Sequence, residues 1–315
     1  MSPGLEPAWV LHTRPYRDTS LLLELLTLTR GRVGAVARGA RGPRSRSRGW
    51  LRPFQPLLVG LAGRGELATL TSAEAAGAAF WLAGERAVAG LYLNELLLKL
   101  LARDDPQPLL LGHYRAALVA LAAPADPEPA LRVFECELLT ALGYAPALAV
   151  DTDGEPLQAD ARYHYRPDAG ARRLPGLAEA PAGGVELSGR TLLALAAGAE
   201  SFTCPDRDTL REARTLTRSL IDHCLGGRPV RTRELARAFR SLAAPAGGQR
   251  RAEPARSDQR SGAALVRVPR PARSRADAAA GALGGLRWAV AVAAPDRGAG
   301  RQSPGPTRDC RGRAN

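Results

Sequence analysis

The chain has 315 residues, enough for two domains, and 44 lysine and arginine residues against 31 acidic ones give it a formal net charge of +13. Its four cysteines form no C-x-x-C pair and it has no run of eighteen apolar residues, so neither the usual zinc spacing nor a membrane-spanning helix is expected. The N-terminus lacks a basic segment followed by an apolar run, so we expect no signal peptide and a cytoplasmic location.

The positive charge is concentrated in two places. Residues 25–65 hold nine arginines and no acidic residue, and residues 243–315 hold fourteen arginines against five acidic residues. The rest of the chain is therefore mildly acidic. A focused basic patch attracts an anionic polymer better than dispersed charge does. Because a GC-rich coding sequence also enriches arginine, the position of the arginines is better evidence than their number.

Residues 8–71 have the pattern of short strands separated by turn signals. The expected strands are 9–13, 19–29, 31–38, 57–61 and 66–71. The second is apolar enough for a helix, but Gly31 ends it and another strand-like run follows at once. Five short strands predict a small barrel over residues 1–78, of the oligonucleotide-binding (OB) kind or of the SH3-like kind.

The loop between the third and fourth strands, Gly39–Gly49, has no apolar side chain to bury except that of Ala40. Its charges should therefore stay in solvent, where guanidinium groups suit phosphate oxygens. We expect the loop and its flanks to bind a nucleic-acid backbone; the alternative is a solvated loop with no partner. Trp50 is a candidate for stacking on bases, or else packs against the barrel. The predicted DNA-binding residues are Arg38, Arg41, Arg44, Arg46, Arg48, Trp50 and Arg52.

Apolar residues then recur at helical spacing, which predicts an all-α domain over residues 79–242 and an α+β fold for the whole chain. An irregular insertion rich in proline, glycine and aspartate is expected at about 144–184, with one hairpin near Gly154. The expected helices are 75–102 (as two helices or one bent helix), 113–121, 128–142, 189–197, 209–225 and 233–242. Their candidate N-caps include Ser188, Asp206 or Asp208, and Thr232.

Residues 243–315 are dominated by alanine, arginine, glycine and proline and show no sustained periodicity. Such a tail cannot bury enough surface to offset its chain entropy, so we expect disorder. Two interpretations stay open: a basic arm that adds salt-sensitive contacts to nucleic acid, and GC-rich translation after a shift of reading frame.

The sequence contains no familiar catalytic motif. It has no G-x-x-x-x-G-K-[ST], no G-x-S-x-G and no H-E-x-x-H, and its histidines are scattered. Asp151, Asp153 and Glu155 resemble the start of a calcium loop, but Arg162 stands where the twelfth position needs glutamate. We therefore expect no enzyme activity, no cofactor and no metal.

Four segments, in order and spacing, resemble the RecO family of bacterial recombination and repair proteins. They are GARGPRSRSRGWLRPFQPLLVGLAGRGELATLTSAE, LYLNELLLKLL, LRVFECELLTALGY and GRPVRTRELARAF, and the resemblance covers about residues 8–242. It implies an OB barrel joined to a helical domain, in a nucleoid-associated protein that binds single- and double-stranded DNA. It also implies annealing of complementary strands and, with RecR, loading of RecA on DNA coated with single-strand-binding protein. Many members carry a four-cysteine zinc site after LGY; residues 145–184 hold no cysteine here, so this chain resembles a zinc-free branch.

The resemblance further implies contact with the acidic C-terminal tail of single-strand-binding protein. Arg132 is our candidate for the arginine that binds a carboxylate of that tail; the alternative is a helix-surface ion pair with Glu128 or Glu135. Two rival functions also stay open, namely an RNA-binding or ribosome-associated factor built on the same barrel and an adaptor that binds only proteins.

Overall fold

The computed structural model describes residues 4–45, 47–63, 65–144, 148, 150–175, 183–198, 202 and 206–243. The tail expected at 243–315 lies outside these ranges except for residue 243. The barrel and the helices belong to one compact unit.

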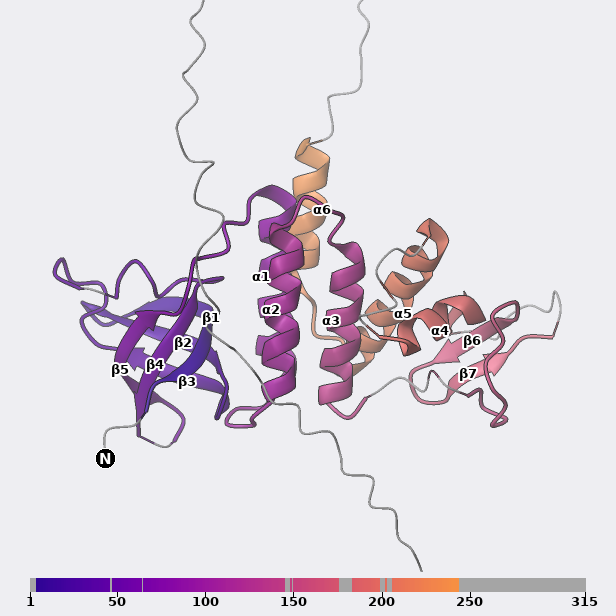
Figure 1. Cartoon of the computed structure of the whole chain (residues 1–315), viewed down its shortest axis with the longest axis horizontal. Coiled ribbons are helices and arrows are strands. Elements are labelled where there is room, and N and C mark those ends of the chain that lie inside the picture. The colour runs from indigo at the N-terminus through magenta and orange to yellow at the C-terminus, as the bar shows by residue number, and fades with distance from the viewer. Residues whose placement is uncertain are drawn as a thin grey trace, which may run out of the picture. The chain divides into compact units, whose positions relative to one another are not determined.

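Five strands close into a barrel in the order β1-β2-β3-β5-β4, with β4 paired back on β1 (Figure 1). Only the β3–β5 pair is parallel; the other neighbours are antiparallel. The predicted OB barrel is therefore confirmed over the SH3-like alternative. Its strands are β1 (Glu6–Tyr16), β2 (Ser20–Thr27), β3 (Gly31–Ala37), β4 (Pro56–Ala62) and β5 (Ala68–Ala75).

Strands β1 and β2 are apolar on both faces because both faces are covered. Val10, Leu23 and Leu25 belong to the barrel core, whereas Trp9 and Leu26 pack into the core of the helices. A strand buried on both sides loses the alternation of apolar and polar residues. This explains why residues 19–29 have the composition of a helix although they form a strand.

Six helices follow in the described part of the chain: α1 (Gly84–Leu100), α2 (Pro108–Ala122), α3 (Glu128–Ala141), α4 (Gly189–Ala196), α5 (Arg207–Leu225) and α6 (Arg231–Ala243). The expected helix 75–102 was wrong at its start. Its first residue, Ala75, still pairs with Leu57 in the barrel, and residues 76–83 form an extended linker. The expected domain boundary between residues 78 and 79 falls in this linker.

Two of the three predicted N-caps are confirmed. The side chain of Ser188 accepts a hydrogen bond from the amide of Thr191, and that of Asp206 accepts one from the amide of Thr209. Thr232 was wrong as a cap, because α6 already begins at Arg231.

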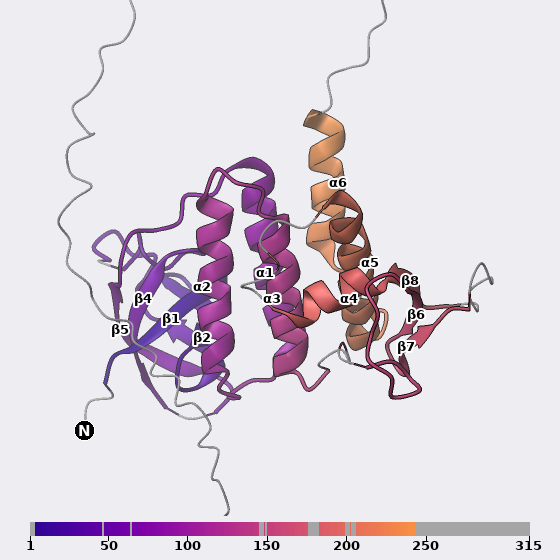
Figure 2. The ribbon, with the colours of Figure 1, turned by 45° about the vertical axis from the view of Figure 1, so that its right-hand side comes forward.

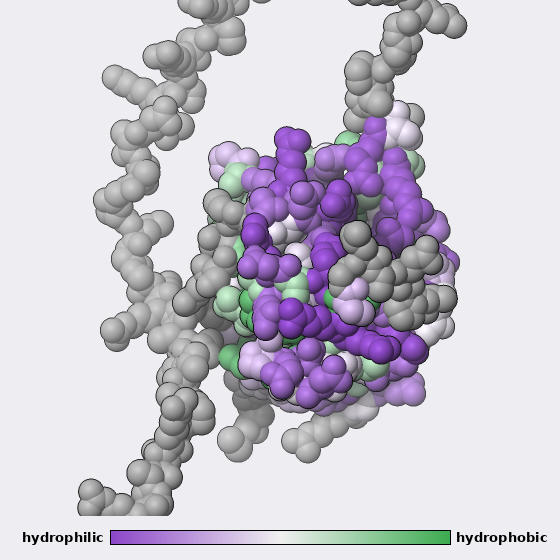
Figure 3. Space-filling model, turned by 90° about the vertical axis from the view of Figure 1, so that its right-hand side faces the viewer, coloured by the Kyte–Doolittle hydropathy of each residue, from purple (hydrophilic) through white to green (hydrophobic). Residues whose placement is uncertain are grey.

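The expectation of an irregular insertion at 144–184 was also wrong. Strands β6 (Arg162–Arg166), β7 (Gly170–Arg173) and β8 (Val185–Ser188) form an antiparallel sheet in the order β7-β6-β8. Strands of four or five residues are too short to show a period of two, but β6 anchors the sheet because Tyr163 and Tyr165 are buried in the helical core. The hairpin expected near Gly154 is present as a single bridge between Val150 and Pro156. The surface at this end of the molecule is mostly hydrophilic (Figure 3).

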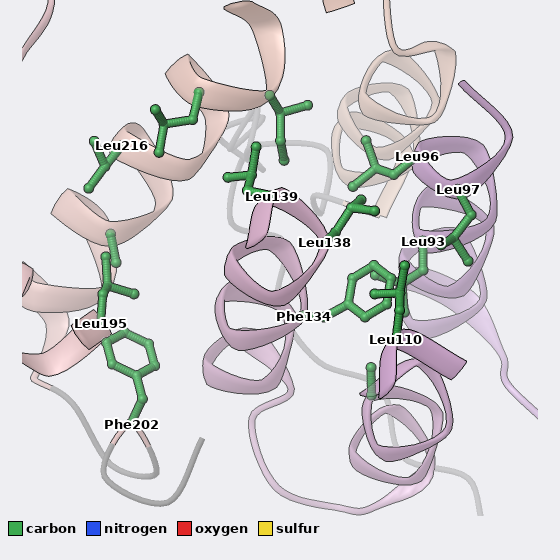
Figure 4. Close-up of a cluster of buried hydrophobic side chains, with 14 of the residues drawn as sticks. Leu93, Leu96, Leu97, Leu110, Phe134, Leu138, Leu139, Leu195, Phe202 and Leu216 are labelled. Carbon is green, nitrogen blue, oxygen red and sulfur yellow. The ribbon is translucent and has the colours of Figure 1, made fainter. Parts of the chain in front are cut away.

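The helices pack around a second hydrophobic core that the barrel shares through Trp9 and Leu26. In Figure 4, leucines of α1 and α2 face Phe134 and Leu138 of α3, and Leu195 and Leu216 approach from α4 and α5. Burying each large apolar side chain contributes about 1.5–3 kcal/mol. The barrel residues Trp9, Leu11 and Leu26 buried in this core therefore help to attach the helices to the barrel.

One buried amide joins barrel and helices by polar contacts. Leu11 sits at a bulge in β1, where it has no partner in the β2 ladder. Asn94 of α1, 2 % exposed, donates to the carbonyl of Leu11 over 2.9 Å and accepts from the hydroxyl of Tyr114 over 2.6 Å. Asn94 thus satisfies two buried groups that would otherwise lack partners.

Asn94→Leu should lower the free energy of unfolding by about 3 kcal/mol, because the carbonyl of Leu11 and the hydroxyl of Tyr114 would stay buried without partners. Urea unfolding monitored by circular dichroism measures this loss. Tyr114→Phe removes only the hydroxyl and should cost about 1 kcal/mol. Equal losses for the two variants would contradict the bridging role of Asn94.

Candidate nucleic-acid interface

The arginine-rich loop is anchored at both ends instead of projecting freely. Ala40 and Leu51 are 1 % and 4 % exposed and belong to the barrel core. Backbone hydrogen bonds from Gly42 to Gly39 and from Ser45 to Gly42 fold the intervening chain into successive turns. Sequence analysis expected the loop to stay in solvent and did not foresee that Ala40 and Leu51 fix its ends in the barrel core.

The charges of the loop point to solvent as expected. Arg38, Arg41, Arg44 and Arg48 are exposed, and none of them forms an ion pair with a carboxylate of the described residues. The amide of Arg41 donates to the carbonyl of Thr19 over 2.8 Å, which holds the loop beside the β1–β2 turn. Arg46, the remaining predicted arginine inside the loop, lies outside the described residues.

Two arginines just before the loop have structural partners. Arg30 pairs with Asp104 over 2.9 Å, and Arg32 pairs with Glu24 over 3.1 Å while donating to the carbonyl of Leu101. Arg103, beyond α1, also pairs with Glu24. These contacts join the barrel to the segment after α1, so Arg30 and Arg32 are not available to a ligand in the way that the loop arginines are.

The residues that follow the loop are partly exposed. Trp50 is 36 % exposed, so it lies at the surface and not in the core. The guanidinium of Arg52 lies 4.2 Å from the centroid of the Trp81 ring, a contact that sequence analysis missed. Phe54 is partly buried and packs against the helical core. The exposed loop arginines, Trp50 and half-buried Arg52 therefore all belong to the connection between β3 and β4.

A separate cleft lies among α1, α3, α5 and α6, the helices seen together in Figure 2. Its volume is about 620 Å³. Val88, Tyr92, Leu131 and Phe239 supply apolar lining, and seven arginines stand against four carboxylates around them. The cleft is therefore both apolar and net positive, although the helical domain as a whole is mildly acidic.

Arg132 lines this cleft but is 6 % exposed. It pairs with Glu135 over 2.9 Å and with Glu128 over 3.9 Å, so the predicted alternative of an ion pair is confirmed, although the pair is buried and not on the helix surface. Glu135 also accepts from the hydroxyls of Tyr92 and Thr217. Burial, together with the charge of Glu135, raises the pKa of the Tyr92 phenol. The Nε of Arg132 is buried and has no hydrogen-bond partner among the described residues.

Two exposed arginines of the cleft were missed by sequence analysis. Arg237 and Arg240 lie on α6, line the cleft and form no ion pair with a described carboxylate. The signal was present, because Arg233, Arg237 and Arg240 recur at a spacing of four and three residues and so share one helix face. Sequence analysis used that segment only to place a helix.

Helix α6, one wall of the cleft, is held in place by a carboxylate of α1. Glu95 accepts hydrogen bonds from the amides of Arg231 and Thr232 over 2.9 and 2.8 Å, and from the hydroxyl of Thr232. Burial alone would raise the pKa of Glu95, but these hydrogen bonds outweigh it and lower the pKa below the ordinary value of 4.5. The ionised form of Glu95 therefore stabilises the cleft.

Within the described ranges, no three histidine, cysteine, aspartate or glutamate side chains come together as a metal site would require. None of the described helices has the length and apolar character needed to cross a membrane.

Comparison with known proteins identifies relatives of both halves. Residues 1–79 match the family model described as "Recombination protein O N terminal", and residues 82–234 match "Recombination protein O C terminal". A DNA repair protein RecO of Alkalilimnicola ehrlichii is 48 % identical over 74 % of this chain and 90 % of its own length. Proteins of the same name from Laribacter hongkongensis and Halorhodospira halophila are each 46 % identical over 75 % of this chain, and the matches cover 95 % and 97 % of their lengths.

Glu95→Gln should lower the free energy of unfolding by about 1 kcal/mol at pH 7, because an amide is a weaker acceptor than a carboxylate. Since folding lowers the pKa of Glu95, the stabilisation is present above pH 4.5 and is lost as the pH falls through the folded value. The difference between the parent and the variant should therefore shrink toward zero once the pH has fallen below the folded pKa of Glu95. Urea unfolding at several pH values measures it, and a difference that grows on acidification would contradict the assignment.

Proposed function

This chain belongs to the RecO family of DNA repair proteins, and on that premise we propose that it is a recombination mediator that binds both single- and double-stranded DNA. In this role it anneals complementary strands and, with RecR, helps RecA to load on DNA coated with single-strand-binding protein. The activity is one of binding and alignment, without a covalent step and without a cofactor.

The observation that supports DNA binding is the set of exposed loop arginines without carboxylate partners. Arg38, Arg41, Arg44 and Arg48 project from a loop whose ends are fixed in the barrel core. Guanidinium groups in solvent neutralise phosphates and release counterions, which gives binding that is independent of sequence and sensitive to salt. Anchoring reduces the entropy lost when the loop takes hold of a strand.

Annealing follows from the same charge. Two complementary strands repel each other through their phosphates until base pairs form. A cluster of exposed cations on the loop of a small barrel screens this repulsion while leaving the bases free. Binding to the phosphate backbone also allows the same loop to hold duplex DNA.

The cleft among the helices supports the proposed contact with an acidic peptide. Exposed Arg237 and Arg240 suit carboxylates, and apolar lining from Leu131 and Phe239 suits a hydrophobic residue of the peptide. Arg132 remains our candidate for a carboxylate contact deeper in the cleft, where its ion pairs with Glu128 and Glu135 fix its position. We assign the acidic tail of single-strand-binding protein to this cleft.

Replacing Arg44, Arg46 and Arg48 with alanine should weaken binding of a single-stranded oligonucleotide and lower the slope of log K against log salt by about one to three. Fluorescence anisotropy at several salt concentrations measures both quantities. A control variant with alanine at Arg115, Arg172 and Arg173, which are also exposed, removes the same charge elsewhere. If the two variants weakened DNA binding equally, the loop would contribute only through the net charge of the protein and not as a binding site.

The same titration with RNA of matched sequence tests the rival RNA-binding function. We expect DNA to compete at least as well as RNA. A marked preference for RNA would favour the rival, and no binding of either polymer would favour a protein adaptor.

Arg237→Ala combined with Arg240→Ala should weaken binding of an acidic peptide that ends in an apolar residue with a free carboxylate by about tenfold, because two charge-assisted hydrogen bonds are lost. A fluorescein-labelled peptide of this kind provides the measurement, and its amidated form is the matched ligand control. Single-stranded DNA binding should change little. Undiminished peptide binding by the double variant would exclude this cleft.

A further inference from the structure

The linker between the barrel and the helices carries an indole in solvent. Trp81 is 79 % exposed, the largest exposure of a bulky apolar side chain in the described part of the chain. Tryptophan is usually well buried, so an indole this exposed calls for an explanation. Its neighbours Phe80 and Leu82 are half-buried and pack against the helical core, whereas Trp81 and the following Ala83, Gly84 and Glu85 are exposed.

The position of Trp81 is fixed by the backbone around it. Residues 76–80 continue the β4–β5 pairing beyond the ends of the strands, with hydrogen bonds from Ala76 to Pro56 over 2.9 Å and from Phe80 to Phe54 over 3.0 Å. The buried side chain of Gln55 donates to the carbonyl of Gly77 over 2.9 Å. Trp81 is therefore held at a defined place on the rim of the barrel, one residue beyond a paired segment.

The Trp81 indole is also contacted by an arginine that follows the arginine-rich loop in the sequence. The guanidinium of Arg52 lies 4.2 Å from the ring centroid, within the range of a cation–π contact. With Arg52 over one face and 79 % of the side chain exposed, the other face is open to solvent. Arg52 follows Trp50, whose side chain is 36 % exposed, and the loop arginines precede both.

We propose that Trp81, positioned by Arg52, is a stacking platform for an unpaired base, so that a single strand runs from the basic loop onto the linker. This inference rests on the proposed DNA-binding function and adds a base contact to it. A base in single-stranded DNA has a free face to place on an aromatic ring, whereas a base inside a duplex is already stacked on both sides. Trp81 thereby favours single strands over duplex, while the loop arginines serve both.

A protein partner is the less suitable occupant. Aromatic anchors of protein interfaces lie at the centre of well-packed patches from which water is excluded. Trp81 is instead 79 % exposed, although its neighbours Phe80 and Leu82 are half-buried, and the guanidinium of Arg52 lies over its ring. Alternating cations and exposed aromatic rings are the arrangement that single-stranded nucleic acid prefers.

The test uses the full chain with Trp81→Ala and Trp81→Phe. Trp81→Ala should weaken binding of a thymidine oligonucleotide about tenfold without altering the salt slope, because it removes stacking but no charge. Trp81→Phe should retain most of the affinity, since its ring still stacks. Duplex binding should be unchanged in both variants. An abasic oligonucleotide of the same length should bind the parent and Trp81→Ala equally.

The outcomes separate this inference from the proposed function. If the parent chain binds no oligonucleotide, the proposed function fails. If the parent binds and Trp81→Ala binds equally well, the inference fails while the function stands. A loss that affects duplex, abasic and thymidine ligands alike, together with a lower melting temperature, would make Trp81 a structural clamp on the linker and overturn the stacking role. The stacking role would also be overturned if Trp81→Ala left DNA binding unchanged and weakened the binding of a protein partner.

Discussion

Strands β1 and β2 form a wall that the barrel shares with the helices, and the rest of the structure depends on this shared wall. Trp9 and Leu26 face the helical core while Val10 and Leu25 face the barrel core, so one pair of strands serves two hydrophobic interiors. The bulge at Leu11 leaves a buried backbone carbonyl outside the β2 ladder, and its hydrogen bond with Asn94 fixes how α1 meets the barrel. With this wall covered, the β3–β4 connection supplies an arginine-rich loop that stays in solvent.

The arginines of this chain include two classes. Some pair with carboxylates and have a structural role, and others have no such partner among the described residues and remain in solvent. Arg30 and Arg32 have carboxylates at about 3 Å and join the barrel to the segment after α1. Arg44 and Arg48 have no carboxylate partner among the described residues and remain in solvent. The same division holds in the cleft, where Arg132 is buried between glutamates while Arg240 is exposed on α6. Arginine enrichment alone would not distinguish these classes.

Sequence reasoning succeeded where local pattern determines structure. Turn residues around strand-like runs were enough to predict the barrel, and the absence of acids in residues 25–65 was enough to locate its basic loop. It failed for β6 to β8, because strands this short show no period, and for the start of α1, because pairing with β4 extends β5 to Ala75. Arg132, the arginine expected to bind a peptide carboxylate, does line the cleft, but Arg240 was missed because it comes from a helix far from Arg132 in the chain. Trp81 meets Arg52 only through the pairing of residues 54–56 with 76–80.

Arg52 has a planar side chain whose two uses do not conflict. The Arg52 guanidinium contacts the Trp81 ring through its central carbon, 4.2 Å from the ring centroid. The N–H groups of a guanidinium lie in its plane and point outward, so they can still donate to acceptors at its edge. Under the proposed stacking, a phosphate oxygen at that edge and a base on the far side of the indole belong to the same short stretch of strand. Arg52 then fixes the distance between the phosphate site and the stacking site. The contact does not depend on base sequence, but it does depend on the spacing of successive nucleotides.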